Sequence, residues 1–363
     1  MRRAPKAYFL SYPENCDGAP HHRMALRFLA AKGLDIVPID TGGRTFVERI
    51  SNFLRALVFA YARNISGEAS LIYIESAPQT VLLFFLRFLK CSIVYQTQDY
   101  LEPRQNIRYN IFRFFERSAA RRANLVVSNE INRARFIAFD YGLAEIPIVV
   151  RTALPRDWPV PECANSDRAI LRKKFGLPVD RKLIAAGGGI SDDRMSFQLV
   201  GAIKYLPKDF AVVFTGHAQS DFRDTEFQKL VDDSRIFFVE RMPYKELLRL
   251  YSVCDIGVLL YPHNSIGHFY QCPGRLTEYM RCGLPVVFSK FPGFELLCLK
   301  YKIGQCCDAT ESKSIADACI AVSDCSVFEP ERIKHVAKNE LAYEEGARDL
   351  WDSVSRMLNR NAV

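Results

Sequence analysis

Two charged side chains, Arg275 and Glu278, stand three residues apart in an expected short helix and can do complementary chemistry. Pro273 fits the first turn of that helix, where its missing N–H costs nothing, and Gly283 fits the position just past its end. Helix starts attract anions, and an arginine there is a bidentate ligand for phosphate. Glu278, one turn on, can accept hydrogen bonds from two sugar hydroxyls. A site that binds phosphate next to a pair of sugar hydroxyls would suit a nucleoside diphosphate.

The rest of the chain alternates apolar runs of strand length with helical patterns, as doubly wound α/β domains do. At 363 residues the chain is long enough for two such domains. It has no G-x-G-x-x-G fingerprint, which disfavours an NAD site. The expected strands cover residues 7–11, 36–39, 71–75, 92–96, 124–128 and 146–150, then 182–186, 211–215, 236–239, 256–261 and 286–288.

The segment from Pro273 to Val287 resembles the nucleotide-sugar motif of GT-B glycosyltransferases, in the broad group related to glycogen synthase and bacterial mannosyltransferases. In a branch of that group the motif reads roughly Pro-x-Lys-x-x-Glu-Tyr-x-x-x-Gly-x-Pro-Val-Val. Arg275 replaces the lysine and keeps its charge. The longer form of the motif has an earlier glutamate, and Tyr270 occupies that position here.

The resemblance implies a GT-B fold, in which two Rossmann-like domains face a cleft. We expect residues 1–150 to form a basic, acceptor-binding domain and residues 165–340 to form the nucleotide-sugar-binding domain. Residues 151–164 hold three prolines and are the expected linker. The helix in 341–363 is expected to cross back to the first domain, as it does in the resembled group.

A glycine triplet at 187–189 follows an expected strand and would let the backbone approach a ligand closely. In the resembled group a glycine-rich loop and a basic residue at this place bind the donor diphosphate, and Arg194 matches the basic position. His268 lies in the loop before the motif, where it either contacts the donor or is solvated. The expected donor-binding residues are Gly188, Gly189, Arg194, His268, Gly274, Arg275, Leu276 and Glu278.

Gln98 and Asp99 follow the expected strand at 92–96, and open α/β sheets bind ligands beyond such strand ends. The resembled group often has a polar pair here. Asp99 is the candidate catalytic carboxylate, either as a base or as an acceptor ligand; the alternative is a turn residue that caps the next helix. Gln98 and Gly18, in the loop after the first strand, are the other expected acceptor-side residues.

The net charge of +8 lies in the first half of the chain. Residues 1–155 carry 21 Lys and Arg against 13 Asp and Glu, whereas residues 156–363 carry 28 of each. This asymmetry predicts an anionic partner, and a membrane surface or lipid-linked acceptor fits better than nucleic acid, because no nucleic-acid-binding motif is present. The arginine-rich segment 105–122 reads either as an interfacial helix or as an ordinary amphipathic helix with a solvated basic face.

The remaining composition bounds the location and the chemistry. The chain is 49% hydrophobic and 25% charged, which favours a globular protein over a disordered one. Eleven cysteines, an odd count without a C-x-x-C pair, indicate reduced thiols rather than a disulfide framework. We expect a cytoplasmic protein without a transmembrane helix, and peripheral attachment to the inner face of the cytoplasmic membrane is a further hypothesis. No cofactor and no metal are expected.

The resemblance implies a glycosyltransferase that moves a hexose-type sugar from a nucleoside-diphosphate sugar to a glycan or lipid-linked acceptor, in cell-surface polysaccharide or glycolipid assembly. It also implies retention at the anomeric carbon, since inversion would require a base such as Asp99. Two alternatives stay open. A GT-B sugar-nucleotide epimerase would need further acid and base groups around the donor. A non-catalytic GT-B-like binding subunit is favoured by Tyr270 at the glutamate position.

Overall fold

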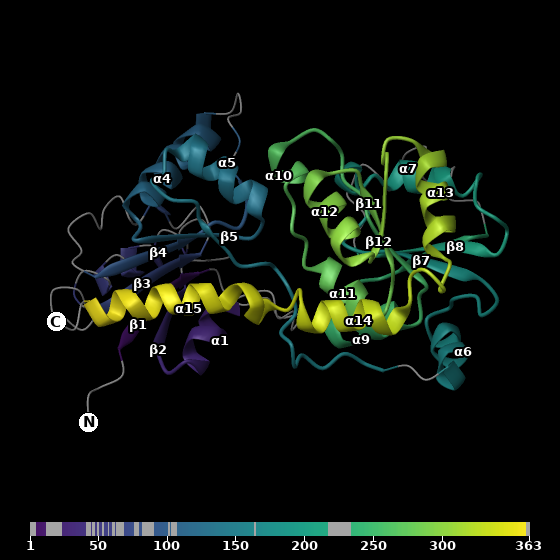
Figure 1. Cartoon of the computed structure of the whole chain (residues 1–363), viewed down its shortest axis with the longest axis horizontal. Helices are drawn as coiled ribbons and strands as arrows, with labels where there is room; N and C mark the ends of the chain where they lie inside the picture. Colours follow the sequence, from purple (N-terminus) through teal and green to yellow (C-terminus); the bar gives the residue numbers. More distant parts are fainter. Residues whose placement is uncertain are drawn as a thin grey trace. The chain divides into compact units, whose positions relative to one another are not determined.

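The protein divides into two compact units, each built on its own parallel sheet (Figure 1). The first unit comprises the described residues up to Thr152 together with those from Tyr343 onward, and the second runs from Ala153 to Ala342. The computed structural model describes residues 5–11, 24–40, 45, 48, 51–52, 54–56, 58–59, 62, 69–75, 80–81, 91–100, 102, 107–162, 165–216 and 234–360.

The first unit holds a six-stranded parallel sheet in the order β2-β1-β3-β4-β5-β6. Its strands are β1 (Lys6–Ser11), β2 (Asp35–Asp40), β3 (Ala69–Glu75), β4 (Ser92–Gln96), β5 (Leu125–Ser128) and β6 (Ile148–Val149). Its helices are α1 (Met24–Ala31), α4 (Ile107–Arg122), α5 (Ile131–Tyr141) and α15 (Tyr343–Arg360). Figure 1 shows α4 and α5 on one side of this sheet and α1 with α15 on the other.

The second unit repeats the design with the strand order β12-β11-β10-β7-β8-β9. Its strands are β7 (Lys182–Ala186), β8 (Phe210–Thr215), β9 (Ile236–Val239), β10 (Ile256–Leu259), β11 (Val286–Ser289) and β12 (Gly304–Cys307). Its helices are α6 (Asn165–Lys174), α7 (Ser196–Ala202), α9 (Tyr244–Ser252), α10 (Ile266–Phe269), α11 (Arg275–Arg281), α12 (Pro292–Tyr301), α13 (Ser312–Val322) and α14 (Pro330–Asn339), with a 3-10 turn, η2, at Asp192–Arg194.

Burial explains why the central strands are continuous apolar runs in the sequence. Every residue of β8, β10 and β11 is buried, because helices cover both faces of a parallel sheet. The prediction of an α/β protein with two doubly wound domains is confirmed by the two sheets.

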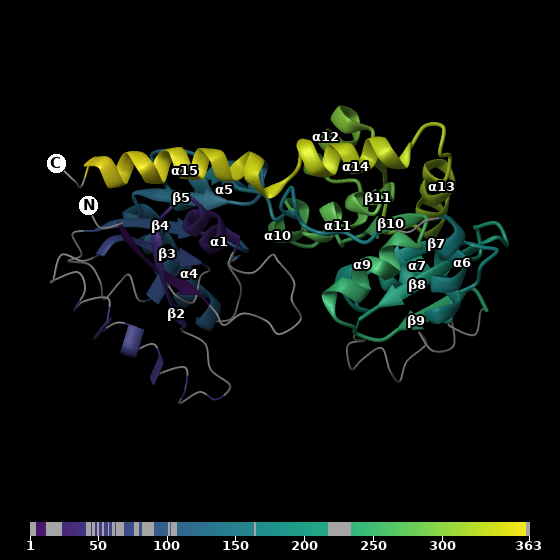
Figure 2. The same ribbon diagram turned by 90° about the horizontal axis from the view of Figure 1, so that it is seen from below.

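The final helix, α15, packs within the first unit (Figure 2). It contacts α1 and β6, and the Tyr343 ring meets the Phe28 ring edge-on at 6.0 Å between centroids. Gly346 lets the helix approach the sheet, since a Cβ there would lie 2.6 Å from the Val149 carbonyl oxygen. The last eighteen-residue helix therefore completes the core of the first unit.

Three arginines at helical spacing on α4 bind the end of α5. Arg113 forms a 2.6 Å ion pair with Asp140, Arg117 donates to the Asp140 carbonyl at 2.7 Å, and Arg121 donates to the Tyr141 carbonyl at 2.5 Å. The last carbonyls of a helix lack intrahelical partners and carry partial negative charge, which suits guanidinium donors. These arginines thus join two helices, a role that neither sequence interpretation of this segment included.

Among the described residues no helix is both long enough and apolar enough to span a membrane.

A carboxyl group lies in the core of the first unit. Glu116 on α4 is fully buried, and its Oε1 accepts a 2.6 Å hydrogen bond from the Tyr95 hydroxyl on β4. Its Oε2 has no hydrogen-bond partner among the residues that the structure describes. Burial raises the pKa of Glu116 from 4.5 to about 7, although the Tyr95 hydrogen bond and the Arg113 charge oppose the rise.

We predict that Glu116→Gln stabilises the protein at pH 8 and not at pH 5. The folded-state pKa exceeds the unfolded value, so the stability that the proton contributes is complete below pH 4.5 and lost as the pH rises through about 7. Glutamine stays neutral, so the variant should gain up to about 3 kcal/mol at pH 8. Urea unfolding at both pH values measures the difference. The exposed Glu145→Gln is the control, and an equal gain at both pH values would refute the proton linkage.

Candidate functional site

The second unit has its topological switch point between β7 and β10. From β7 the chain continues to β8 on one side of the sheet, whereas β10 and then β11 lie on the other. Loops that leave the carboxyl ends of two such strands diverge and leave room for a ligand, which makes this edge the expected binding site of an open α/β sheet. The loop from Gly187 follows β7, and Tyr261 follows β10 at this edge.

Tyr261 is held firmly at this edge. It is 2% exposed, its N–H donates to the Ser289 hydroxyl at 2.8 Å, and that hydroxyl donates to the Tyr261 carbonyl at 3.0 Å. The Phe294 ring of α12 stacks near the Tyr261 ring at 6.5 Å between centroids. The phenol ring therefore has a fixed orientation at the ends of β10 and β11.

Two guanidinium groups lie over the ring of Tyr261. The Cζ of Arg194 is 4.9 Å and that of Arg275 is 5.9 Å from the ring centroid, within the range of cation–π attraction. Arg275 also donates to the Tyr261 hydroxyl at 2.9 Å and to the Gly187 carbonyl. The structure thus brings together two arginines that are about eighty positions apart in the sequence.

This arginine pair has no ion-paired carboxylate among the residues that the structure describes. Burial is the main cause that lowers the pKa of Arg194, with Tyr261 opposing and the Arg275 charge adding to the fall. Burial also acts to lower the pKa of Arg275, but Tyr261, Tyr279 and their neighbours outweigh it and raise that pKa. Two cations of like charge around one ring make an electropositive site that an anion would stabilise.

The backbone beside the pair requires glycine. Gly188 has a φ of +91°, and a Cβ there would lie 2.8 Å from the Cζ of Arg275. The absence of a side chain lets the Arg275 guanidinium lie across the loop. The loop is fixed in turn by the Gly189 N–H, which donates to the Thr215 carbonyl at 3.0 Å.

Two other predicted donor residues lie next to this pair. Glu278 is buried on α11, accepts a 3.1 Å hydrogen bond from the Tyr244 hydroxyl, and contributes to the raised pKa of Arg275. The His268 ring lies 5.9 Å from the Tyr261 ring, with its Nδ1 2.8 Å from the Asn264 side-chain oxygen. Their contacts with a donor stay predictions.

Two further predicted residues, Gly274 and Leu276, lie at the start of the motif helix. Leu276 is 3% exposed, so its side chain belongs to the core. Its N–H donates to the Pro273 carbonyl. Gly274 precedes the helix, and its carbonyl accepts from the N–H and the hydroxyl of Thr277. Any ligand contact of Leu276 would therefore be through its backbone.

The carboxyl edge of the first unit's sheet carries a hydrogen-bonded acid–amide pair. Glu75 ends β3, is 8% exposed, and accepts a 2.7 Å hydrogen bond from the Gln98 side chain. The Gln98 backbone carbonyl accepts hydrogen bonds from Arg133 at 2.9 Å and from Asn129 at 3.3 Å.

Asp99, the other predicted residue of this loop, is held less firmly. Its side chain is 91% exposed, and its contact with the Arg133 guanidinium nitrogen is long, at 3.9 Å. Its catalytic role stays a prediction, and Gly18 lies outside the described residues.

Sequence reasoning missed Tyr261 and Glu75. Each is a polar or aromatic residue at the end of an apolar strand, and this position in the sequence could have identified it as a candidate site residue. Neither belongs to a recognised motif.

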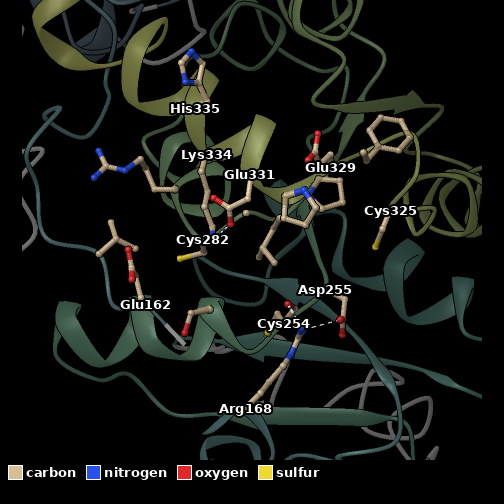
Figure 3. A pocket seen from close by; sticks show the side chains of 18 of the residues that line it. Glu162, Arg168, Cys254, Asp255, Cys282, Cys325, Glu329, Glu331, Lys334 and His335 are labelled. Carbon is tan, nitrogen blue, oxygen red and sulfur yellow. Dashed lines mark hydrogen bonds and ion pairs between the residues drawn. The ribbon is translucent and has the colours of Figure 1, made fainter. Parts of the chain in front are cut away.

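A pocket of about 1340 Å³ lies at the opposite, amino edge of the second sheet. Figure 3 shows Arg168 directed at Asp255 in it, with Lys334 and Glu331 of α14 across the space. Asp255 is neutralised there by Arg168 at 2.6 Å and Arg172 at 2.7 Å. This pocket contains none of the predicted site residues and lies away from the strand ends where such sheets bind ligands.

Within the described ranges no three His, Cys, Asp or Glu side chains gather where they could hold a metal ion. The expectation of metal-free chemistry stays a prediction.

The family model of glycosyl transferases group 1 matches residues 167–340, which include the arginine pair and the motif helix. Most of the second unit therefore matches the group 1 glycosyltransferase family, and the predicted resemblance is confirmed. No curated relative matches the sequence.

Solved structures share the fold across both units. HepE (Alr3699) from Anabaena, crystallised with UDP, has a TM-score of 0.70 at 17% identity, covering 97% of this chain and all of that one. Sucrose-phosphate synthase from Thermosynechococcus elongatus has a TM-score of 0.76 at 14% identity, covering 98% and 99%. WaaG, a glycosyltransferase involved in lipopolysaccharide biosynthesis, has a TM-score of 0.67 at 14% identity, covering 94% and 98%. The chain thus has the GT-B fold.

Proposed function

We propose that the protein transfers a hexose-type sugar from a nucleoside-diphosphate sugar to a glycan or lipid-linked acceptor. The observation that carries the proposal is the arginine pair, Arg194 and Arg275, over the Tyr261 ring at the switch point of the second sheet. A diphosphate is the anion that two adjacent guanidinium groups suit, because each can bind one phosphate.

The same pair supplies the chemical assistance that this reaction needs. When the bond between the anomeric carbon and the phosphate oxygen breaks, negative charge grows on the departing diphosphate. Fixed cations next to that oxygen stabilise the transition state more than the ground state. Glu278, on the same helix as Arg275, is the group that we assign to the ribose hydroxyls.

Uridine diphosphate is the nucleotide that we propose to test first. HepE, which shares the fold, was crystallised with UDP and with UDP-glucose. On the acceptor side, we assign Gln98 and the Glu75 carboxylate that it contacts to acceptor hydroxyls, with Asp99 as the alternative carboxylate.

The family match favours a transferase over the epimerase alternative. An epimerase would need acid and base groups near the donor sugar, and His268 is the titratable ring that the structure places beside Tyr261. A non-catalytic subunit would keep the fold without turnover. Failure of the wild-type protein to bind any nucleotide would favour this alternative.

A second part of the proposal concerns an anionic membrane surface, contacted by α4. Four large side chains near the start of this helix are exposed: Tyr109 (39%), Ile111 (49%), Phe112 (41%) and Phe114 (62%). Beside them a groove of about 500 Å³ is lined by Asn110, Arg113, Phe114, Arg117, Ser118, Arg121 and Arg122. Exposed rings on a helix fit a bilayer surface, where they enter the headgroup region. Arg113, Arg117 and Arg121 bind the end of α5, and the exposed Arg122 is the guanidinium group that we assign to a lipid phosphate.

We predict that Gly188→Ala weakens UDP binding at least tenfold, because the added methyl group would displace the Arg275 guanidinium. Gly176→Ala is the matched control: Gly176 also has positive φ, +70°, but has open space around its missing side chain. Both variants should lose about 1–2 kcal/mol of stability from backbone strain. Thermal shift and calorimetric titration with UDP would compare them, since a ligand of the folded state raises the melting temperature.

Equal UDP affinity in the two glycine variants would contradict the proposed diphosphate site. A wild-type protein that UDP, GDP and ADP all fail to stabilise would contradict nucleotide-sugar transfer and favour the non-catalytic subunit.

The membrane proposal predicts that Phe112→Ser with Phe114→Ser reduces flotation with anionic vesicles at least tenfold, because each buried phenyl ring contributes roughly 1.5–3 kcal/mol. Vesicles of phosphatidylcholine with about a third phosphatidylglycerol are the probe. Ile170→Ser, at a residue 67% exposed on α6, is the control and should float like wild type. Wild-type protein that does not float, or a double variant that floats equally well, would disprove it.

A further inference from the structure

Two thiols meet at the edge of the second sheet. Cys298 lies on α12, one turn before its end, and Cys306 lies on β12, with 3.8 Å between the two Sγ atoms. Both residues are half-buried, so neither is sealed within the core. The distance is van der Waals contact, and a disulfide requires the sulfurs to approach to about 2.05 Å.

The local backbone holds the pair together while leaving one partner room to move. Lys302 ends α12 with a φ of +50°, so the chain reverses at once into β12. Arg332 fixes this turn by donating to the Tyr301 carbonyl at 2.6 Å and the Lys302 carbonyl at 2.7 Å. β12 is an edge strand and pairs only with β11 in the described sheet, so Cys306 can shift toward Cys298.

The other described cysteines lack this arrangement. Cys254, Cys307 and Cys319 are 4% exposed or less, and burial raises the pKa of Cys254 and of Cys307 to about 12. Cys325 is exposed. Among the nine cysteines that the structure describes, Cys298 and Cys306 are the pair in sulfur–sulfur contact.

We propose that Cys298 and Cys306 are a modification site that forms a reversible disulfide on exposure to a peroxide. The Cys306 thiolate attacks one oxygen of the peroxide, the O–O bond breaks, and a sulfenic acid forms with loss of hydroxide. The Cys298 sulfur then attacks the Cys306 sulfur and displaces the sulfenic hydroxyl group as water. Two thiols and one hydrogen peroxide thereby give one disulfide and two waters.

The electrostatics of the pair support this division of roles. The hydrogen bond with Cys306, followed by burial, raises the pKa of Cys298 well above the usual thiol range. In the 3.8 Å contact either sulfur can be the donor, and we assign the donor role to Cys298 and the first attack to Cys306. No lysine or arginine is required by this order of events.

The cysteine pair and the Tyr261 ring are connected through α12. Phe294, which stacks against Tyr261, precedes Cys298 by four residues and so shares its face of α12. A cross-link at Cys298 would fix the helix that supports the Tyr261 ring.

The test is peptide mapping after treatment with hydrogen peroxide, on the whole chain and under non-reducing conditions. Trypsin releases peptides 291–300 and 303–313, which contain Cys298 and Cys306. We expect a linked species whose mass is below the sum of the two reduced peptides by two hydrogens, and which dithiothreitol removes. Blocking with iodoacetamide before treatment should prevent it.

Peptide 303–313 also contains Cys307, so two variants identify the sulfur involved. Cys306→Ser should reduce the linked species at least tenfold, whereas Cys307→Ser and Cys325→Ser should leave its yield within twofold of wild type. Absence of the linked species from peroxide-treated wild type would overturn the proposal. Its persistence in Cys306→Ser would overturn it as well.

Discussion

The second unit depends on one unfavourable arrangement, in which two guanidinium groups share one aromatic ring without an ion-paired carboxylate among the described residues. The Arg275 charge acts to lower the pKa of Arg194, so the two like charges repel each other, and burial makes the repulsion stronger than it would be in water. The protein compensates with fixed supports: Ser289 holds the backbone of Tyr261, Gly187 accepts from Arg275, and Gly188 leaves space for the guanidinium. Such a site attracts a divalent anion more strongly than a site whose arginines are already paired with carboxylates.

The first unit uses its arginines differently. Arg113, Arg117 and Arg121 of α4 bind the carboxyl end of α5, so much of the positive charge at this place stabilises the fold. The apolar side chains at the start of α4, including Phe114, stay exposed. The net charge of the sequence therefore predicts the charge of a binding partner, and the exposed apolar residues of α4 indicate where that partner would bind.

Local patterns made much of this predictable. The strands follow from apolar runs, because residues buried on both faces must be apolar. The motif helix and Arg194 follow from spacing and from the resemblance, and the structure brings Arg194 and Arg275 together as that interpretation requires. Tyr261 and Glu75 were not predicted because their roles depend on strand order, which places the ends of β7 and β10, or of β3 and β4, side by side. The packing of α4 against α5 likewise depends on tertiary contacts.

The most direct test of the account is calorimetric titration of the wild-type protein with UDP and, separately, with UMP. The two ligands differ by one phosphate, so their difference in affinity measures what the second phosphate gains from the arginine pair. We predict that UDP binds at least tenfold more tightly than UMP, which corresponds to about 1.4 kcal/mol. Equal affinities for the two ligands, or no binding of either, would contradict the claim that Arg194 and Arg275 bind a nucleoside diphosphate.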